Sequence, residues 1–453
     1  MGVLLNTEGN VSYTPGAYKI EECTITNKIG QAIDVQPFLQ EVKITESIYS
    51  PTLFCTISVR DDSNILETMP FYGIETIFIR MTRSPLSGSS QSIEKLFYAT
   101  DYPLFGRTER QHVQVWSISG VCLHAWKNGM IKVSRSYGPG PISDEIVKIA
   151  QDTLGLTTMV KGSPFPKGRG IINIQSPLQA IEWLRRRLHE EDGSPFYFYQ
   201  TLQNADNEVV LHSHKNMASQ GPFEKYTSSK DYDKIPGTPE DYDARKRRIL
   251  EVASELKFGK FLPIPDGAYA SKNFNVDIAN RTFGNTFYDY AGKFPLGATI
   301  NKTSVIEPPP SFNWSAPAEG ADKAPTVKPN EETFESEVFS KVSNNSINSE
   351  SFYQSEEQNY TFWGKDKLSE MTAFPGIFDA LVHDVTIFGN FEFNAGKVIE
   401  LTFPKALDPG LAGRGEIFDK NLSGKYITVS ATHIFRDSEY TINFKAKRDS
   451  FSK

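Results

Sequence analysis

The sequence lacks several features that whole classes of protein need. It has only 3 cysteines in 453 residues, Cys23, Cys55 and Cys122. An odd, widely spaced set forms neither a disulfide framework nor a zinc site. Cys55 alternates with Ile57 and Val59 along an apolar face. We therefore expect a buried free thiol in a protein folded in a reducing cytoplasm.

Long apolar runs and an excess of positive charge are also missing. No stretch approaches the ~18 apolar residues of a membrane-spanning helix, so we expect no membrane span. Lys and Arg number 48 against 55 Asp and Glu, which gives a net charge of −7. General binding to a phosphate backbone needs clustered positive charge, and this balance argues against it. Charged residues make up 23% of the chain, which argues against wholesale disorder.

Known catalytic and cofactor-binding motifs are absent as well. The sequence holds no phosphate-binding glycine loop, dinucleotide-binding fingerprint or nucleophile elbow. The best metal candidate is His212-Ser213-His214, because residues two apart on a strand point to the same face. No third ligand is identifiable nearby, so an exposed strand end is the favoured interpretation. We predict no catalytic residue, no cofactor and no metal site.

A second cluster of titratable residues, 189–192, follows a predicted helix. It could supply paired carboxylates for acid–base chemistry, and glycosidase carboxylates stay open because a sequence does not give distances in space. The simpler interpretation is a solvated helix end whose acids are balanced by Arg185, Arg186 and Arg187.

Aromatic residues, by contrast, are plentiful: 31 Phe, 19 Tyr and 5 Trp. Flat rings pack well on pleated sheets. Apolar and polar residues alternate over 42–45, 53–60, 95–98 and 113–118, which predicts short strands separated by turns. Residues 1–135 therefore read as a β-barrel or sandwich.

The apolar spacing changes to that of helices between about 136 and 215. One predicted helix has Ser143 as its cap and Gly155 after its end. A second starts at Ser176, which is followed by a proline at the first helical position. A strand hairpin over 196–212 completes what we expect to be a small α/β unit.

The rest of the chain divides by composition. Segments 216–305 and 361–453 contain further β-strand patterns, whereas 306–360 is rich in Pro, Ser and Glu with scattered aromatics. Such a segment cannot fold alone, and it is either a strap laid along a neighbouring surface or a flexible insertion. Both interpretations stay open.

A weak internal similarity links the two β-rich parts. Segments 42–62 and 429–450 each read as a strand, a serine-containing turn and a second strand, with nearly equal lengths. We interpret this as a hint that one β domain occurs twice.

Four segments, taken in order, carry a resemblance to a known family. They are Ile44-Thr45-Glu46-Ser47-Ile48 through Arg60-Asp61-Asp62; Ser134-Arg135-Ser136-Tyr137 leading to Ser143-Asp144-Glu145-Ile146-Val147; Ser176-Pro177-Leu178 through Phe196-Tyr197-Phe198-Tyr199-Gln200; and Gly389-Asn390-Phe391 with Gly396 through Tyr440-Thr441-Ile442. With this order and spacing the chain resembles the baseplate central hub proteins of contractile-tailed bacteriophages. These share their core with the hub part of type VI secretion spikes. The insertion at 306–360 departs from the compact hub pattern and leaves the boundary of the second β domain open.

The resemblance implies a mainly β fold with an α+β insert. Two similar β-barrel tube domains, 1–135 and 216–305 with 361–453, would flank the small α/β domain 136–215. The segment 306–360 would be an extended insertion. Three chains would form a ring with pseudo-sixfold symmetry between the hexameric tail tube and the trimeric central spike.

The resemblance also implies partners and a location. The homotrimer would contact a tail tube or tube-initiator protein and the central spike, and further partners would be tape measure and baseplate wedge proteins. DNA would pass through the lumen without specific binding, so we expect polar or charged lumen residues. Neighbouring subunits should close open strand edges. The protein would be assembled in the host cytoplasm and reside in the virion tail baseplate.

A structural, non-enzymatic role is the function that this reading favours. Two alternatives from other classes stay open. A tail-associated cell-wall hydrolase would need an additional domain. A carbohydrate-binding β protein would expose Trp and Tyr on one concave face.

Overall fold

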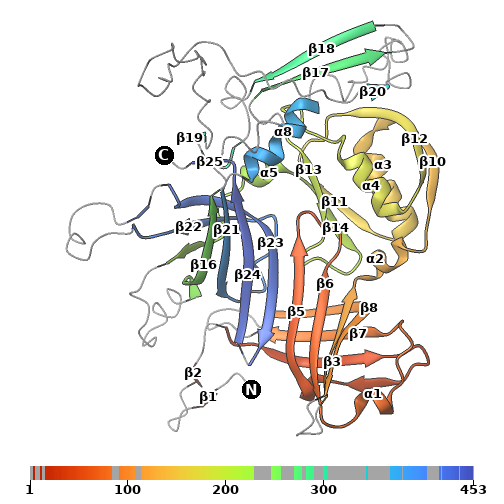
Figure 1. Cartoon of the computed structure of the whole chain (residues 1–453), viewed down its shortest axis with the longest axis vertical. Coiled ribbons are helices and arrows are strands. Elements are labelled where there is room, and N and C mark those ends of the chain that lie inside the picture. Colours follow the sequence, from red (N-terminus) through yellow and green to blue (C-terminus); the bar gives the residue numbers. More distant parts are fainter. Residues whose placement is uncertain are drawn as a thin grey trace, which may run out of the picture.

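The structure is dominated by one long antiparallel sheet. The computed structural model describes residues 4–5, 11–12, 16–83, 91–107, 114–228, 246–256, 270–277, 282–289, 299–301, 303–304, 343–344, 368–379, 381–405, 418–419, 421–437 and 439–451. A small α/β unit and a separate β-hairpin lie at the same end of this sheet (Figure 1). Within the described ranges, no helix has the length and apolar character to cross a membrane. The mainly β fold class with an α+β insert is confirmed.

The long sheet has 13 strands. In chain order they are β3 (Lys19–Thr26), β4 (Ala32–Asp34), β5 (Leu39–Ser47), β6 (Phe54–Asp61), β7 (Thr76–Arg83), β8 (Gln91–Arg107), β9 (Gln114–Val121), β15 (Lys225–Thr227), β16 (Ile249–Leu256), β21 (Leu381–Phe388), β22 (Val398–Thr402), β23 (Gly424–Arg436) and β24 (Glu439–Arg448). Across the sheet the order is β16-β21-β24-β23-β5-β6-β9-β8-β7-β3-β4, with β22 beside β23 and β15 beside β22.

The sheet contains the same arrangement twice. The first set is β5, β6, β7, β8 and β9, and the second set is β16, β21, β22, β23 and β24. Numbered along the chain within each set, both are ordered 1-2-5-4-3 across the sheet. The sets meet where β23 pairs antiparallel with β5.

Matched irregularities strengthen the correspondence. In each set, strand 1 shifts its register against strand 2 at one place, and strand 4 shifts against strand 5 at another; β8 has one further shift against β9, between Asp101 and Leu104. The matched shifts are Leu39/Glu41 with Ile249/Glu251, and Ala99/Asp101 with Thr428/Ser430. Bulges are specific features of a strand pair. Two of them at equivalent places indicate a duplicated unit of strands.

The internal similarity predicted between 42–62 and 429–450 is wrong in its residues, although the duplication exists. These segments form the hairpins β5–β6 and β23–β24, which lie side by side in the sheet but take positions 1–2 and 4–5. The counterpart of β5–β6 is β16–β21. Residues 257–380 separate that pair, where the first set has only 48–53.

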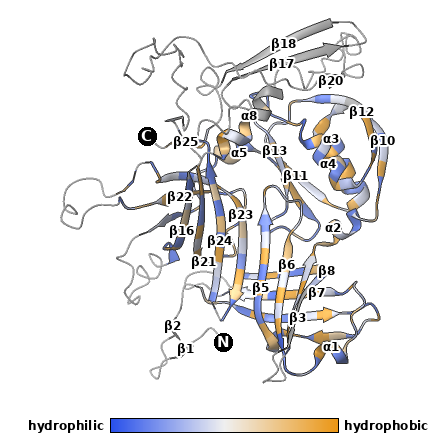
Figure 2. Cartoon of the chain, in the orientation of Figure 1, coloured by the Kyte–Doolittle hydropathy of each residue, from blue (hydrophilic) through white to orange (hydrophobic). Residues whose placement is uncertain are grey.

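One apolar core runs under both sets. Its members alternate with polar residues along each strand, as the change between orange and blue along β5 and β23 shows (Figure 2). The strands predicted in the first third and at the C-terminal end are confirmed. All three cysteines are free and buried, and burial raises the pKa of the Cys122 thiol to about 11.

The α/β unit contains α2 (Leu123–Asn128), β10 (Val133–Pro141), α3 (Ile142–Ile149), a π-helical turn (Ala150–Leu154), β11 (Thr157–Lys161), β12 (Lys167–Gln175), α4 (Pro177–Arg185), β13 (Phe196–Tyr199), β14 (Glu208–Ser213) and α5 (His214–Ala218). Strands β10 and β12 form a ribbon, and β11-β14-β13 form a small sheet. The unit has an apolar core of its own, to which α3 and α4 contribute.

The local predictions for this unit have mixed outcomes. The start of α4 is confirmed: Ser176 precedes Pro177, and its N–H donates to Gln179 Oε1 at 3.2 Å. Ser143 as a cap is wrong, because α3 begins at Ile142 and Ser143 lies buried in its first turn. The predicted end of this helix is confirmed: the π-helical turn that continues α3 stops at Leu154, and Gly155 follows it with a φ of +72°. The hairpin over 196–212 is the antiparallel pair β13–β14.

The remaining elements are β1 (Leu4–Leu5), β2 (Val11–Ser12), a 3-10 turn (Gln36–Phe38), α1 (Ile65–Thr68), β17 (Ala270–Asp277), β18 (Thr282–Asp289), β19 (Thr303–Ser304), β20 (Ser343–Asn344), α8 (Leu368–Phe378) and β25 (Ser450–Phe451). The hairpin β17–β18 and helix α8 fall within 257–380. Apart from β20, the segment 306–360 lies outside the described residues, so the choice between strap and flexible insertion stays a prediction.

Glu46, near the end of β5, connects three parts of the molecule. Its side chain is fully buried. Oε2 accepts the backbone N–H of Leu202 at 2.6 Å, from the α/β unit, and Oε1 accepts that of Ala395 at 2.5 Å, from the β21–β22 connection. His433 on β23 lies 3.8 Å from Oε1 and shares a 2.7 Å hydrogen bond with Tyr440. One carboxylate therefore fixes how both strand sets and the α/β unit meet.

Replacing Glu46 with alanine leaves two buried N–H groups without their acceptor. We expect Glu46→Ala to lower the free energy of unfolding by about 3–5 kcal/mol, and Glu46→Gln by less, because the amide keeps one acceptor oxygen. Urea unfolding followed by tryptophan fluorescence measures both. Glu41→Gln on the same strand is the control, and a change below about 1 kcal/mol is expected because its ion pairs are partly exposed. A Glu46→Ala protein as stable as the wild type contradicts this role.

Candidate assembly surface

The metal candidate His212-Ser213-His214 is divided between two elements. His212 ends up on β14, with Nδ1 2.9 Å from the Tyr199 hydroxyl and Nε2 2.8 Å from Asn216 Oδ1. His214 starts α5 and places Nε2 3.1 Å from Asp449 Oδ2. The prediction that this is an exposed strand end is wrong, because both rings are buried. Each ring has separate protein partners, and the described residues contain no group of three potential metal ligands.

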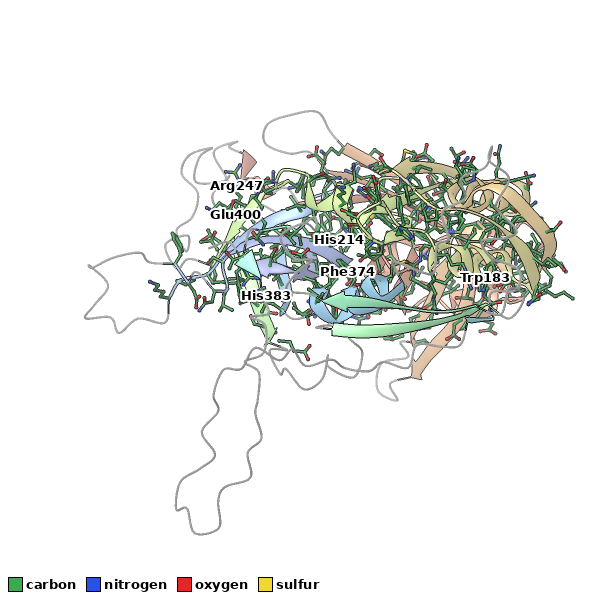
Figure 3. All side chains as sticks on the ribbon, turned by 90° about the horizontal axis from the view of Figure 1, so that it is seen from above. Trp183, His214, Arg247, Phe374, His383 and Glu400 are labelled. Atoms are coloured by element: carbon green, nitrogen blue, oxygen red, sulfur yellow. The ribbon has the colours of Figure 1, made fainter. Side chains whose placement is uncertain are left out.

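His214 instead belongs to an aromatic junction. Its ring centroid lies 4.5 Å from that of Phe374 and 5.0 Å from that of Phe378, both on α8. Figure 3 shows His214 next to Phe374, with Trp183 to one side of them and His383 to the other. The polar contact with Asp449 therefore connects α5 to the C-terminal strands, and the ring contacts connect it to α8.

The acidic cluster 189–192 is also structural, but its predicted partners are wrong. Glu190 is buried and accepts hydrogen bonds from Ser213 Oγ and from the Ser163 N–H. Asp192 lies 3.2 Å from Lys215 Nζ. Sequence reasoning missed Lys215 as a partner, because only the turn from β14 into α5 brings it close to Asp192.

The three arginines find other partners. Arg185 and Arg186 contact Glu182 at 2.6 and 2.9 Å, one helical turn earlier on α4. The Arg187 guanidinium lies over the Trp183 ring at 3.7 Å from its centroid. Arg185 also donates to the Phe196 carbonyl of β13 at 2.6 Å, so these contacts of the arginines are with α4 and the neighbouring strand and not with the acidic cluster.

The long sheet presents a polar face on the side opposite its core. We call this the polar face; it spans β16, β21, β24, β23, β5, β6, β9 and β8. Hydroxyl and amide groups are frequent on it, and charges of both signs are mixed. Representative members are Glu41, Lys43, Thr45, Thr56, Ser58, Arg60, Asp384, Thr386, Ser430, Thr432, Arg436, Thr441, Asn443 and Lys445.

Opposite charges on the polar face stand close together. Lys43 Nζ lies 2.6 Å from Glu41, and Arg436 lies 3.9 Å from the same carboxylate. Lys445 lies 3.9 Å from Asp384. Such pairing leaves little net field over the face, which is unsuited to holding a polyanion.

The join between the sets is a regular antiparallel pair. β23 and β5 pair from Ser430 opposite Ser47 to Arg436 opposite Glu41. At its centre Thr432 faces Thr45, and their hydroxyl oxygens are 3.1 Å apart. The join therefore contributes continuous backbone hydrogen bonds as well as side-chain contacts on the polar face.

Within the described part of the chain, two strand edges that border the polar face are open, those of β16 and of the second half of β8; β7, β3 and β4 continue the sheet beside the first half of β8. Among the residues that the structure describes, β16 pairs along its length only with β21, and its residues 251–255 are exposed. β8 pairs with β7 up to Tyr98, but from Asp101 onward only with β9. β16 contains neither lysine nor proline, the residues that commonly protect an edge. Unpaired edges of this length are typical of a surface that another chain covers.

A groove of about 1270 Å³ opens at the end of the sheet where β23 turns into β24. The join and the ends of β3 and β6 form its walls. Charged side chains of both signs line it, namely Lys19, Glu21, Glu41, Arg60, Asp62, Arg436 and Asp437. This end lies opposite the α/β unit (Figure 1).

By sequence, neither a protein-family model nor a curated protein matches this chain. By structure, it is similar to the tail protein from Neisseria meningitidis MC58, with a TM-score of 0.50, 10% identity, and coverage of 96% of this chain and 97% of that one. It is also similar to the 43 kDa tail protein of prophage MuSo2 from Shewanella oneidensis, with a TM-score of 0.51, 11% identity, and coverage of 95% and 99%. The chain has the fold of phage tail proteins.

The sequence resemblance to phage hub proteins is confirmed at the level of this fold. A type VI secretion component from E. coli aligns more distantly, with a TM-score of 0.42, 8% identity, and coverage of 95% of this chain and 76% of that one.

Two glycines in the segments that carry the resemblance, Gly389 and Gly396, stand where a side chain would not fit. A Cβ on Gly389 would stand 2.0 Å from the Tyr440 ring. Gly396 has a φ of +84°, and a Cβ there would meet the Tyr199 hydroxyl.

Two buried histidines make stability depend on pH. Burial lowers the pKa of His212 to about 4, and burial together with the nearby Arg448 lowers that of His383 to about 4. Since an unfolded histidine titrates near 6.5, the unfolded state binds more protons between these values. Stability is therefore complete above about pH 6.5 and falls as the pH drops toward 4, by up to about 3 kcal/mol for each histidine.

His383→Gln tests this dependence. The Nδ1 of His383 contacts Ser254 Oγ at 2.7 Å and its Nε2 contacts the Tyr426 hydroxyl at 2.9 Å, so an amide can replace both contacts. Urea unfolding at pH 7 and pH 4.5 should show a smaller acid-induced loss in the variant than in the wild type. Carboxylates titrate equally in both proteins and cancel in this difference. An identical loss in the two proteins would contradict the assignment.

Proposed function

We propose that this protein is a structural baseplate hub of a contractile phage tail. Three copies form a ring that joins the hexameric tail tube to the trimeric central spike. The observation that carries the proposal is the duplicated strand set, joined internally through β23 and β5, with an open edge of the same kind at each end. The fold shared with phage tail proteins supports it.

Ring closure follows from the duplication. Strand 4 of the second set pairs with strand 1 of the first set inside the chain. The same head-to-tail contact between chains would join strand 4 of the first set to strand 1 of the second set of a neighbour. Three chains then supply six similar units in a closed ring, in which the open edges of β16 and of the second half of β8 are paired.

The two ends of the ring would have different symmetry. The α/β unit follows β9, and the 257–380 connection precedes β21, so both extra parts emerge at one end of the sheet, once in each chain. That end has only threefold symmetry, which fits a trimeric spike. At the other end, each strand set has its connection between strands 2 and 3, at 62–75 and 389–397, and six such connections in a trimer would fit a hexameric tube. The tube domains 1–135 and 216–305 with 361–453, the α/β domain 136–215 and the insertion 306–360 remain the domain scheme that we propose.

Other partners follow from this placement. A tail tube or tube-initiator protein would contact the charged groove at the pseudo-sixfold end, and tape measure and wedge proteins would approach the lumen and the outer wall. The protein would be assembled in the host cytoplasm and remain in the virion baseplate. Its role is structural rather than enzymatic. A muralytic zymogram tests the hydrolase alternative, and a glycan-binding assay tests the carbohydrate-binding one.

Light scattering coupled to size exclusion measures the number of chains directly. A trimer has a mass of about 152 kDa, three times the 50.8 kDa chain. We expect this species at micromolar concentration, alone or after addition of the spike protein. A protein that stays monomeric at all concentrations, with and without the spike, contradicts the proposed ring.

The polar face would line the DNA passage. We expect no retention of double-stranded DNA in a filter-binding assay at 150 mM salt, because paired charges and hydroxyl groups release few counterions. Thr441→Lys with Asn443→Lys on β24 should create salt-dependent binding, whereas Thr441→Gln with Asn443→Gln should not. Binding of DNA by the wild type, or no binding by the lysine variant, contradicts the assignment of this face.

A further inference from the structure

We infer that neighbouring chains pair β8 with β16, in the register that the chain already uses between β23 and β5. This inference rests on the proposed ring and adds the strands, the residues and the register of its seam. The occupant of each open edge is thereby a second copy of this chain. Backbone pairings that both strand sets share support this seam.

β8 and β23 are equivalent as fourth strands. Each pairs with strand 3 of its set in its first half and leaves that partner afterwards: β23 at Ile427, β8 at Tyr98. Each then has a register shift against strand 5, and β8 has a second one between Asp101 and Leu104, so the correspondence with β23 is counted from Leu104 onward. Beyond that point β23 takes β5 as its partner, whereas the corresponding side of β8 has none among the described residues. Leu104 of β8 occupies the position of Thr432.

The equivalence of Leu104 and Thr432 can be followed through three strands. Leu104 pairs with Ser117, and Ser117 pairs with Ser58 of strand 2. Thr432 pairs with Asn443, and Asn443 pairs with Thr386 of strand 2. Ser58 and Thr386 are themselves equivalent, because each is the first pair after the bulge between strands 1 and 2.

β16 and β5 are equivalent as first strands. The shared bulge places Glu251 at the position of Glu41. Counting onward from there, Ala253 takes the position of Lys43 and Glu255 that of Thr45. β5 is covered by β23 on its outer edge, whereas the outer edge of β16 has no strand partner in the described ranges.

The register between β23 and β5 inside the chain can be transferred to β8 and the β16 of a neighbouring chain, which gives the residue pairs of the seam. Inside the chain Thr432 faces Thr45, His433 faces Ile44, and Ile434 faces Lys43. Between chains, the equivalent positions place Leu104 opposite Glu255, Phe105 opposite Ser254, and Gly106 opposite Ala253 of the neighbour. Arg107 then falls opposite Val252.

This register gives a reason for the exposed sequence of β16. Val252 is 41% exposed in the single chain although its counterpart Val42 is fully buried. In the internal join, Val42 faces Phe435 of β23. A paired β16 would cover Val252 in the same way. On the edge strand β16, the apolar residue Val252 therefore stands where its counterpart Val42 on β5 is covered by a neighbouring strand.

Paired cysteines test both the strands and the register. In Leu104→Cys with Glu255→Cys, the two thiols would take the places of Thr432 and Thr45, whose hydroxyls are 3.1 Å apart. Mild oxidation should produce covalent dimers and trimers on a non-reducing gel. The native cysteines are buried, so the background should be low. Thr45→Cys with Thr432→Cys is the positive control and should cross-link within the chain.

The matched control shifts the register by four residues. Leu104→Cys with Glu251→Cys has the same strands and the same faces, and it should give at least tenfold less cross-linked product. Equal melting temperatures of both variants and the wild type show that the fold is kept. Equal cross-linking of the two pairs, or stronger cross-linking of the shifted pair, overturns the register.

Light scattering on the same samples separates the possible failures. A trimer of about 152 kDa in which Leu104→Cys with Glu255→Cys does not cross-link overturns the seam but leaves the hub proposal standing. A monomer under all conditions overturns both.

Discussion

Unpaired backbone groups along a strand edge are the constraint on which this structure depends. The chain satisfies them at one edge by joining β23 to β5, which makes two strand sets into one sheet over a single core. The buried carboxylate of Glu46 lies on the core side of this join. It accepts hydrogen bonds from backbone N–H groups of the α/β unit and of the β21–β22 connection. The same constraint is unmet at β16 and at the second half of β8. An incomplete sheet in one chain is thereby the physical basis for an assembly.

Insertions explain why the duplicated sets do not look alike in sequence. Copies of a strand unit keep their pairing order and bulges because these depend on the backbone. Their core side chains can be replaced by other apolar residues without loss of the fold, so the two sequences diverge. In the second set, 257–380 separates the first two strands, and it places a hairpin and α8 at the end that carries the α/β unit. The two strand sets therefore differ most at the end that carries the α/β unit, the β17–β18 hairpin and α8.

Much of the local structure could be predicted from the sequence. Alternation identified the strands around Cys55 and Val385, and the Ser176–Pro177 start located α4, because periodicity and caps are local signals. The residues of the duplication could not be predicted, since similarity of length favoured 429–450 over the divided pair β16–β21. Ser143 was misjudged as a cap because a serine within the first helical turn has the same local sequence.

The candidate surface was only partly accessible to sequence reasoning. The sequence contains no recognisable catalytic motif, and the hub resemblance predicts strand edges that neighbouring chains close. The role of Glu46, however, depends on atoms from Leu202 and Ala395, which are far away along the chain. Nor could the burial of His212 and His214 be read from a short polar segment that resembles an exposed strand end.

Electron cryomicroscopy of the assembled protein, reconstructed without imposed symmetry, tests the central claim most directly. The account predicts a closed ring of three chains whose strand wall is nearly sixfold at the end of the β23–β24 turns and strictly threefold at the end of the α/β units. A ring that is sixfold throughout, or a twofold dimer that buries a different surface, would contradict it.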